Sequence, residues 1–215
     1  KKMSKSIGNI LDPIEIIKNY GIDQLRYYLI KEVSLGNDGS ISMENLKNCI
    51  NNDLANNYGN LCQRVFSFLK KNCNNKIPKK NNINGDDIKL INNVKNNIPK
   101  LIDLMNNQNL NEYIKIVVNF SFDANKYFND SEPWAVKKKD PERMNAILFT
   151  IVEQIKNISI LLNPIIPNTT NRVLAMINVS PENISIDKIK DPNILNNEKE
   201  IGNLKILFTK IEDDN

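Results

Sequence analysis

The sequence predicts an all-α protein, a helix bundle preceded by a short N-terminal segment. Apolar residues recur at steps of three, four and seven through most of the 215 residues, which is the spacing of amphipathic helices. Asp, Ser and Pro mark the starts and ends of these stretches. No internal repeat and no strand–helix alternation appears. We therefore expect helices packed on one another rather than on a sheet.

Two short helices are expected in the N-terminal segment. Asp12 can cap the first helix, and Pro13 suits its first position. After Gly21, the apolar residues of 22–29 return at helical spacing and predict the second. The turn cluster Gly-Asn-Asp-Gly-Ser follows at 36–40. We therefore divide the chain into an N-terminal segment, 1–36, and a bundle with a C-terminal tail, 37–215.

The bundle begins with a long helix capped by Ser42, in which apolar residues run from Leu46 to Phe68. An Asn- and Lys-rich loop over 72–86 should follow it. Pro99 should kink the next helix or shift its start. The remaining elements are a helix from Asp86, a helix over 113–128, a helix from Asp140 that ends before Pro164 and Pro167, a shorter helix holding 173–177, and an irregular tail from Pro181.

The composition excludes several classes of protein. The absence of histidine rules out Ser-His-Asp and Cys-His hydrolases and every His-ligated metal. Cys49, Cys62 and Cys73 form no C-x-x-C pair, so we expect no metal site and no disulfide scaffold, and a cytoplasmic location fits best. No uninterrupted apolar run approaches the ~18 residues of a membrane span. The net charge of +4 is compatible with a nucleic-acid partner but does not require one.

The segment Lys2-Met3-Ser4-Lys5-Ser6, followed by Ile-Gly-Asn, can bind a polyphosphate. Ammonium groups offset phosphate charge, and hydroxyls and loop amides donate hydrogen bonds. By composition alone, such a run is more often a solvated tail.

The letters K-M-S-K-S-I-G-N, with D-Q-L-R-Y-Y-L after the next helix start, resemble the second signature of class I aminoacyl-tRNA synthetases. That resemblance implies an ATP site formed by Lys2, Ser4, Lys5 and Ser6, with Mg accompanying ATP in the intact enzyme. Lys5 would stabilise the phosphates in the activation step, and Lys2 would assist. The first signature of the class, His-Ile-Gly-His, and its Rossmann-type catalytic domain are not in these residues. The chain is thus expected to be a C-terminal piece that is inactive alone.

The bundle offers residues suited to unpaired RNA bases. Asn60 and Arg64 lie four apart and share one helix face, where an amide and a guanidinium fork suit base edges. The only Trp, Trp134, follows a proline in a helix connection and precedes three lysines. An indole at such a rim can stack on a base. The alternatives are surface decoration for the Asn/Arg pair and a core anchor for the Trp.

Residues 53–65, D-L-A-N-N-Y-G-N-L-C-Q-R-V, are similar to the first bundle helix of methionyl-tRNA synthetases, and E-P-W-A-V-K at 132–137 is similar to their Trp-bearing connection. N-P-I-I-P at 163–167 and L-F-T-K-I-E at 207–212 also resemble that family. The resemblance implies anticodon binding by Asn60, Arg64 and Trp134, and tRNA(Met) as the partner of an ATP-dependent methionine–tRNA ligase.

Two departures from that family are visible. No oligonucleotide-binding domain follows the bundle, so we expect a monomer, and the loop at 72–86 has no counterpart. Two alternatives stay open: another class I synthetase (leucyl, isoleucyl, valyl or cysteinyl), and a free-standing, non-catalytic RNA-binding helical module.

Overall fold

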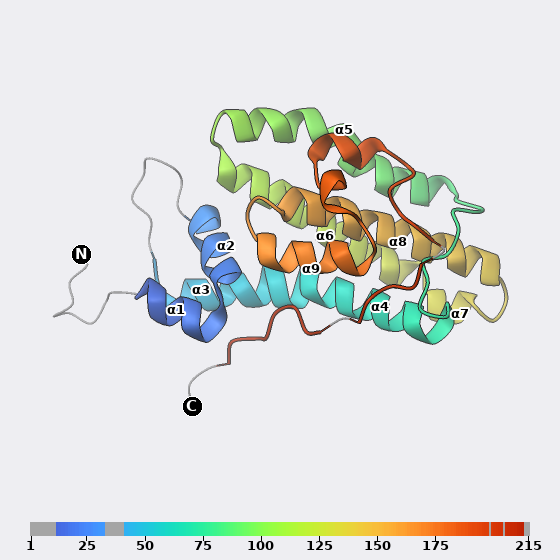
Figure 1. Cartoon of the computed structure of the whole chain (residues 1–215), viewed down its shortest axis with the longest axis horizontal. Helices are drawn as coiled ribbons and strands as arrows, with labels where there is room; N and C mark the ends of the chain where they lie inside the picture. The colour runs from blue at the N-terminus through green and yellow to red at the C-terminus, as the bar shows by residue number, and fades with distance from the viewer. Residues whose placement is uncertain (1–11, 33–40, 198, 204, 213–215) are drawn as a thin grey trace.

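The computed structural model describes residues 12–32, 41–197, 199–203 and 205–212 (Figure 1). Within these residues the regular elements are all helices, and one isolated bridge pairs Lys76 with Glu200. The all-α prediction is therefore confirmed. The segment with Lys2, Ser4, Lys5 and Ser6 and the boundary at 36/37 lie outside the described residues.

Two helices form the N-terminal end, α1 (Pro13–Tyr20) and α2 (Ile22–Glu32). The Asp12 carboxylate accepts the Ile14 amide at 2.8 Å, as its sequence position predicted. Gly21 joins the two helices at φ 108°, a conformation that glycine adopts without a Cβ penalty. The buried Tyr27 fastens α2 to the next helix, because its hydroxyl donates to Asp53 at 2.8 Å.

One unbroken helix runs over residues 43–72 in three parts: α3 (Met43–Cys49), the π-helical η2 (Ile50–Gly59) and α4 (Asn60–Asn72). Ser42 caps it by accepting the Asn45 amide at 3.1 Å. The expected long helix is therefore present. Its middle third has the wider i→i+5 hydrogen bonding, which the sequence did not predict.

The later helices follow the predicted order. α5 starts one residue before Asp86, with Asn84 as its cap, and continues through the exposed Pro99, so the expected shift of its start is wrong. A short helix not predicted, α7, lies in the Trp134 connection. The elements are α5 (Gly85–Asn106), α6 (Leu110–Asp130), α7 (Pro133–Val136), α8 (Pro141–Leu162), α9 (Pro167–Met176), and the 3₁₀ turns η3 (Pro181–Asn183) and η4 (Ile186–Lys190).

The central helix of the core is α8, which packs against α4, α5, α6, α7 and α9. By length and composition α8 is long and apolar enough to cross a membrane, although it contains no long uninterrupted apolar run. However, 94% of its most apolar 18-residue window is buried by the other elements, as in the core helix of a bundle. α1 and α2 lie at one end of the molecule, and α7 lies at the other (Figure 1).

Candidate nucleic-acid interface

Arg64 lies on α4, where that helix packs against α6. Its guanidinium carbon lies 5.1 Å from the centre of the Phe128 ring, and its Nη2 donates to Asn129 Oδ1 at 2.6 Å. Both partners come from the last turns of α6. The two contacts hold the guanidinium in place, and its other N–H donors make no hydrogen bond with the residues that the structure describes.

Trp134 lies on α7, in the connection between α6 and α8. Glu132 adopts a left-handed conformation (φ 40°) that turns the chain, and Pro133 starts the short helix. The indole packs nearly perpendicular to the Phe128 ring, at 5.9 Å between centroids and 79° between planes, and is 41% exposed. A ring anchored on one side and open on the other can stack on an unpaired base.

Phe128 therefore brings Arg64 and Trp134 together, although seventy positions separate them in the sequence. Phe128 itself is buried at 2% exposure, and Phe68 of α4 also packs on it, at 6.3 Å and 87°. Arg64 and the exposed Trp134 thus meet on one buried ring at one end of the bundle.

Asn60 lies one helical turn before Arg64 on the same face of α4 and is half-buried. Three residues earlier, in η2, Asn57 Oδ1 accepts from Asn125 of α6 at 3.0 Å, so Asn60 lies in the sequence between two contacts that join the long helix to α6. In the described part of the chain its side-chain amide makes no hydrogen bond.

Sequence reasoning missed Phe128 and Asn129. A Phe at helical spacing is typical of any core, and an Asn near a helix end is typical of a surface. Only the packing of α6 on α4 shows that both side chains contact Arg64.

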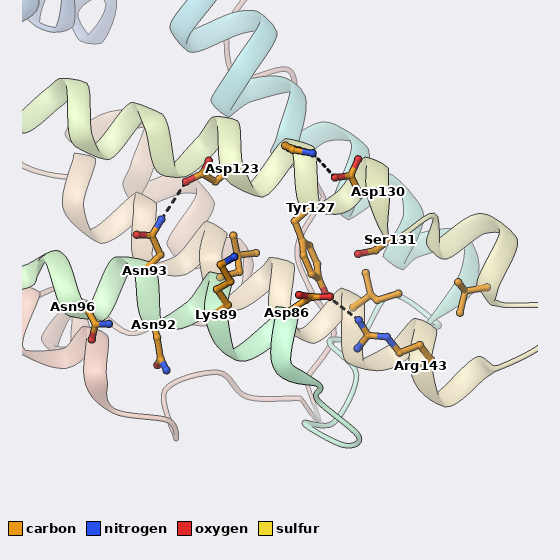
Figure 2. Close-up of a pocket in the computed structure, with 14 residues that line it drawn as sticks. Asp86, Lys89, Asn92, Asn93, Asn96, Asp123, Tyr127, Asp130, Ser131 and Arg143 are labelled. Carbon is orange, nitrogen blue, oxygen red and sulfur yellow. Dashed lines mark hydrogen bonds and ion pairs between the residues drawn. The ribbon is translucent and has the colours of Figure 1, made fainter.

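An open groove of about 870 Å³ is lined by residues of α5, α6, α7 and α8 (Figure 2). Tyr127 and Arg143 point toward one another across it, and both contact the buried carboxylate of Asp87. Burial alone would raise the pKa of Asp87, but hydrogen bonds from Arg143, Tyr127 and the Asn84 amide outweigh it and hold that pKa below its usual value. Asp123 accepts from Asn93, and Lys126 pairs with Asp130. The predicted site residues do not line this groove, and most of its polar groups bond one another.

The cysteines are unsuited to catalysis. Cys49 and Cys62 are buried, and Cys73 is half-buried. Burial raises the pKa of Cys49 to about 12 and that of Cys73 to about 11, so both thiols stay protonated near neutral pH. Among the described residues there is also no group of three or more Cys, Asp or Glu side chains that could hold a metal ion.

Comparison with known proteins gives the class first. Residues 1–66, which include the Lys-Met-Ser-Lys-Ser segment, match the family model of tRNA synthetases class I (M). Residues 77–215 match the family model of the anticodon binding domain of methionyl tRNA ligase. The chain belongs to the methionyl-tRNA ligase family and contains its anticodon-binding region. The leucyl, isoleucyl, valyl and cysteinyl alternatives are thereby set aside.

Relatives and solved structures agree with this assignment. The methionine–tRNA ligase of Brucella suis biovar 1 (strain 1330) is 38% identical over 83% of this chain and 35% of its own length. The enzyme of Rickettsia bellii (strain RML369-C) is 32% identical over 99% of this chain and 42% of its own length. The Mycobacterium tuberculosis methionyl-tRNA synthetase bound by methionyl-adenylate matches with a TM-score of 0.89 and 29% identity. The match covers 97% of this chain and 42% of that structure's chain. Its apo form matches with a TM-score of 0.87 and 26% identity, covering 95% of this chain and 42% of that structure's chain. The chain thus spans well under half of each relative.

Proposed function

We propose that this chain reads the anticodon of tRNA(Met) as part of a methionine–tRNA ligase. The observation that supports this proposal best is the meeting of Arg64 and the exposed Trp134 on Phe128 at one end of the bundle. Trp134 stacks on an unpaired base, Arg64 binds a base edge with its free donors, and the unbonded amide of Asn60 completes the contact. Each role suits the geometry of its side chain.

The ATP-dependent half of the reaction involves residues outside the described part of the chain. By the resemblance of their motif, Lys5 and Lys2 offset the phosphate charge of ATP, which carries its Mg, and Ser4 and Ser6 donate hydrogen bonds. Ammonium and hydroxyl donors fit phosphate oxygens chemically. The methionine-activating centre belongs to the longer enzyme. We further propose that this enzyme is a cytoplasmic monomer.

The anticodon assignment is tested with Trp134→Ala and Arg64→Gln in binding to tRNA(Met) transcripts. Loss of stacking is worth ~1–3 kcal/mol, so Trp134→Ala should weaken binding by about one to two decades. Arg64→Gln should cost a similar ~1–3 kcal/mol and also reduce discrimination against a transcript with one changed anticodon base.

The matched control is Phe122→Ala. Phe122 is an aromatic of α6 with 48% exposure, comparable to that of Trp134, but it makes no ring contact with Phe128. It should leave tRNA affinity unchanged. If Trp134→Ala and Phe122→Ala bound tRNA(Met) equally well, with anticodon discrimination intact, the proposed interface would be wrong.

A further inference from the structure

The Asn- and Lys-rich loop between α4 and α5, residues 73–84, lies beside the turn between α7 and α8, residues 137–140. At its start, Lys137 Nζ donates to Asn72 Oδ1 at 2.9 Å. At its end, Asn82 Nδ2 donates to Glu142 Oε2 at 2.5 Å. One bond thus joins the end of α4, just before the loop, to the α7–α8 turn, and the other joins the end of the loop to the first turn of α8.

The loop is an ordered element rather than a tail. Asn75 exchanges two 2.8 Å hydrogen bonds with Ile201 of the C-terminal segment, and Ile77 is 1% exposed. Asn74, Asn75 and Asn82 have positive φ, which asparagine tolerates better than most residues. The asparagines therefore shape the loop, and its lysines are left for another role.

These two segments and the last turn of α4 carry an excess of positive charge. Two of their acidic neighbours do not pair with these lysines, since Asp140 caps α8 by accepting from the Arg143 amide and Glu142 accepts from Asn82. In the described part of the chain, their lysines form no ion pair with an acid. We call this surface the lysine corner: the exposed Lys70, Lys71, Lys79, Lys80, Lys137, Lys138 and Lys139.

We propose that the lysine corner binds the phosphodiester backbone of the RNA whose bases contact Arg64 and Trp134, an inference that rests on the proposed function. The two surfaces are continuous, because residues 137–139 follow α7 directly and residues 70 and 71 lie on the same helix as Arg64. Ammonium groups on flexible stems bind phosphate as point charges and carry no sequence information. Protein interfaces are depleted in lysine, so a protein partner fits this surface less well.

The test measures the salt dependence of tRNA(Met) binding for Lys79→Gln/Lys80→Gln and Lys138→Gln/Lys139→Gln. Each lost phosphate contact should reduce the magnitude of the slope of log K against log salt by ~0.7–0.9. Each double variant should therefore have a slope about 1.4 to 1.8 smaller in magnitude than that of the unaltered protein. At 0.1 M salt its affinity should fall by at least about tenfold. Discrimination between cognate and changed anticodons should not change. The matched control is Lys188→Gln/Lys190→Gln, two exposed lysines of η4, which packs on α5 and α8.

A thermal unfolding curve for each variant ensures that binding is compared between folded proteins. If Lys79→Gln/Lys80→Gln keeps the wild-type slope while anticodon discrimination is intact, the loop does not contact phosphate and this inference is overturned. If the η4 control reduces the slope equally, the effect is one of net charge and the inference is also overturned. If the unaltered chain shows no anticodon discrimination, the proposed function fails instead, and the slope alone then decides about the lysine corner.

Discussion

At the scale of single residues, the proposed interface depends on a side chain that RNA cannot reach. Phe128 presents its ring to the guanidinium of Arg64, packs nearly perpendicular to the Trp134 indole, and is almost wholly buried. A cation–π contact such as that of Arg64 is worth ~0.5–1 kcal/mol at an exposed site. An aromatic pair such as Phe128 and Trp134 is worth ~0.5–1.5 kcal/mol. These energies order two side chains that would otherwise sample several rotamers.

Phe128→Leu should therefore weaken RNA recognition without touching RNA. Leucine fills most of the space but has no ring, so Arg64 and Trp134 should lose their shared support. We expect about a tenfold loss of tRNA(Met) affinity, from roughly 1–2 kcal/mol of lost positioning, with poorer anticodon discrimination. Trp134 is the only Trp in the chain, so its fluorescence emission should report the change directly.

The control for this variant is Phe120→Leu, a buried Phe of the same helix that makes no ring contact with Arg64 or Trp134. Both variants should lose similar stability in urea unfolding, but only Phe128→Leu should change tRNA binding and emission. Equal binding by the two variants would show that Phe128 is an ordinary core residue.

Sequence alone could identify Arg64 and Trp134 as candidates because the chemistry of these side chains suits RNA bases wherever they are placed. It could not identify Phe128, whose role depends on which helix packs on which. The sequence could not identify Asn129 for the same reason, since its role depends on the 2.6 Å hydrogen bond that its Oδ1 accepts from Arg64 Nη2. Contacts between helices distant in the sequence leave no local signal.

At the scale of elements, the least expected feature is the π-helical stretch η2, Ile50–Gly59. Such stretches are rare and often occur at functional sites. This one carries Asp53, which accepts from Tyr27 at 2.8 Å and from Lys31 at 2.6 Å and so joins α2 to the long helix. It also ends at Gly59, where a Cβ would lie 2.9 Å from the Leu54 carbonyl oxygen and 3.2 Å from the Phe208 ring.

Gly59→Ala should therefore destabilise the protein, although alanine is favoured over glycine by ~1 kcal/mol inside an ordinary helix. The added methyl group meets a backbone oxygen that cannot rotate away, so either the π geometry or the Phe208 packing must shift. We expect a loss of about 1–3 kcal/mol in the free energy of unfolding, the usual range for overpacking. Urea titration followed by circular dichroism measures it.

Gly85→Ala is the matched control, because a Cβ at Gly85 has nothing within 4 Å. Gly85 is exposed in the first turn of α5, so this change should be neutral or slightly stabilising. If Gly59→Ala were as stable as Gly85→Ala, the close packing of Gly59 against the Leu54 carbonyl and the Phe208 ring would not exist in solution.

The apolar spacing of the sequence predicted the long helix but not its π-helical middle, because a spacing of about four residues fits both kinds of helix. Capping residues were better guides: Asp12, Ser42 and Asp140 each start a helix at the predicted position. The four-residue α7 is too short for a periodic pattern to show.

At the scale of the whole molecule, the N-terminal helices and the bundle share one core. Buried apolar residues from Ile16 of α1 to Phe208 of the tail form a single cluster. The tail returns along the long helix, where Asn51 and Ile211 exchange two 2.9 Å hydrogen bonds. One family match ends at residue 66, inside α4, and the other begins at 77. The division at 36/37 stays a prediction, and the packing of the described residues crosses it.

This continuous core leads us to expect that the 215-residue polypeptide folds but does not activate methionine by itself. Activation requires ATP and methionine to be held in near-attack geometry, with donors placed around the reacting phosphate. In the role proposed for them, Lys2 and Lys5 would supply only part of such a site, and the absence of histidine from these residues means that a His-Ile-Gly-His signature cannot complete it. Methionine-dependent ATP–pyrophosphate exchange should therefore stay at background. A full-length methionine–tRNA ligase, such as that of Brucella suis, serves as the positive control. Exchange clearly above background, abolished by Lys5→Ala, would show that these residues contain a complete activation site.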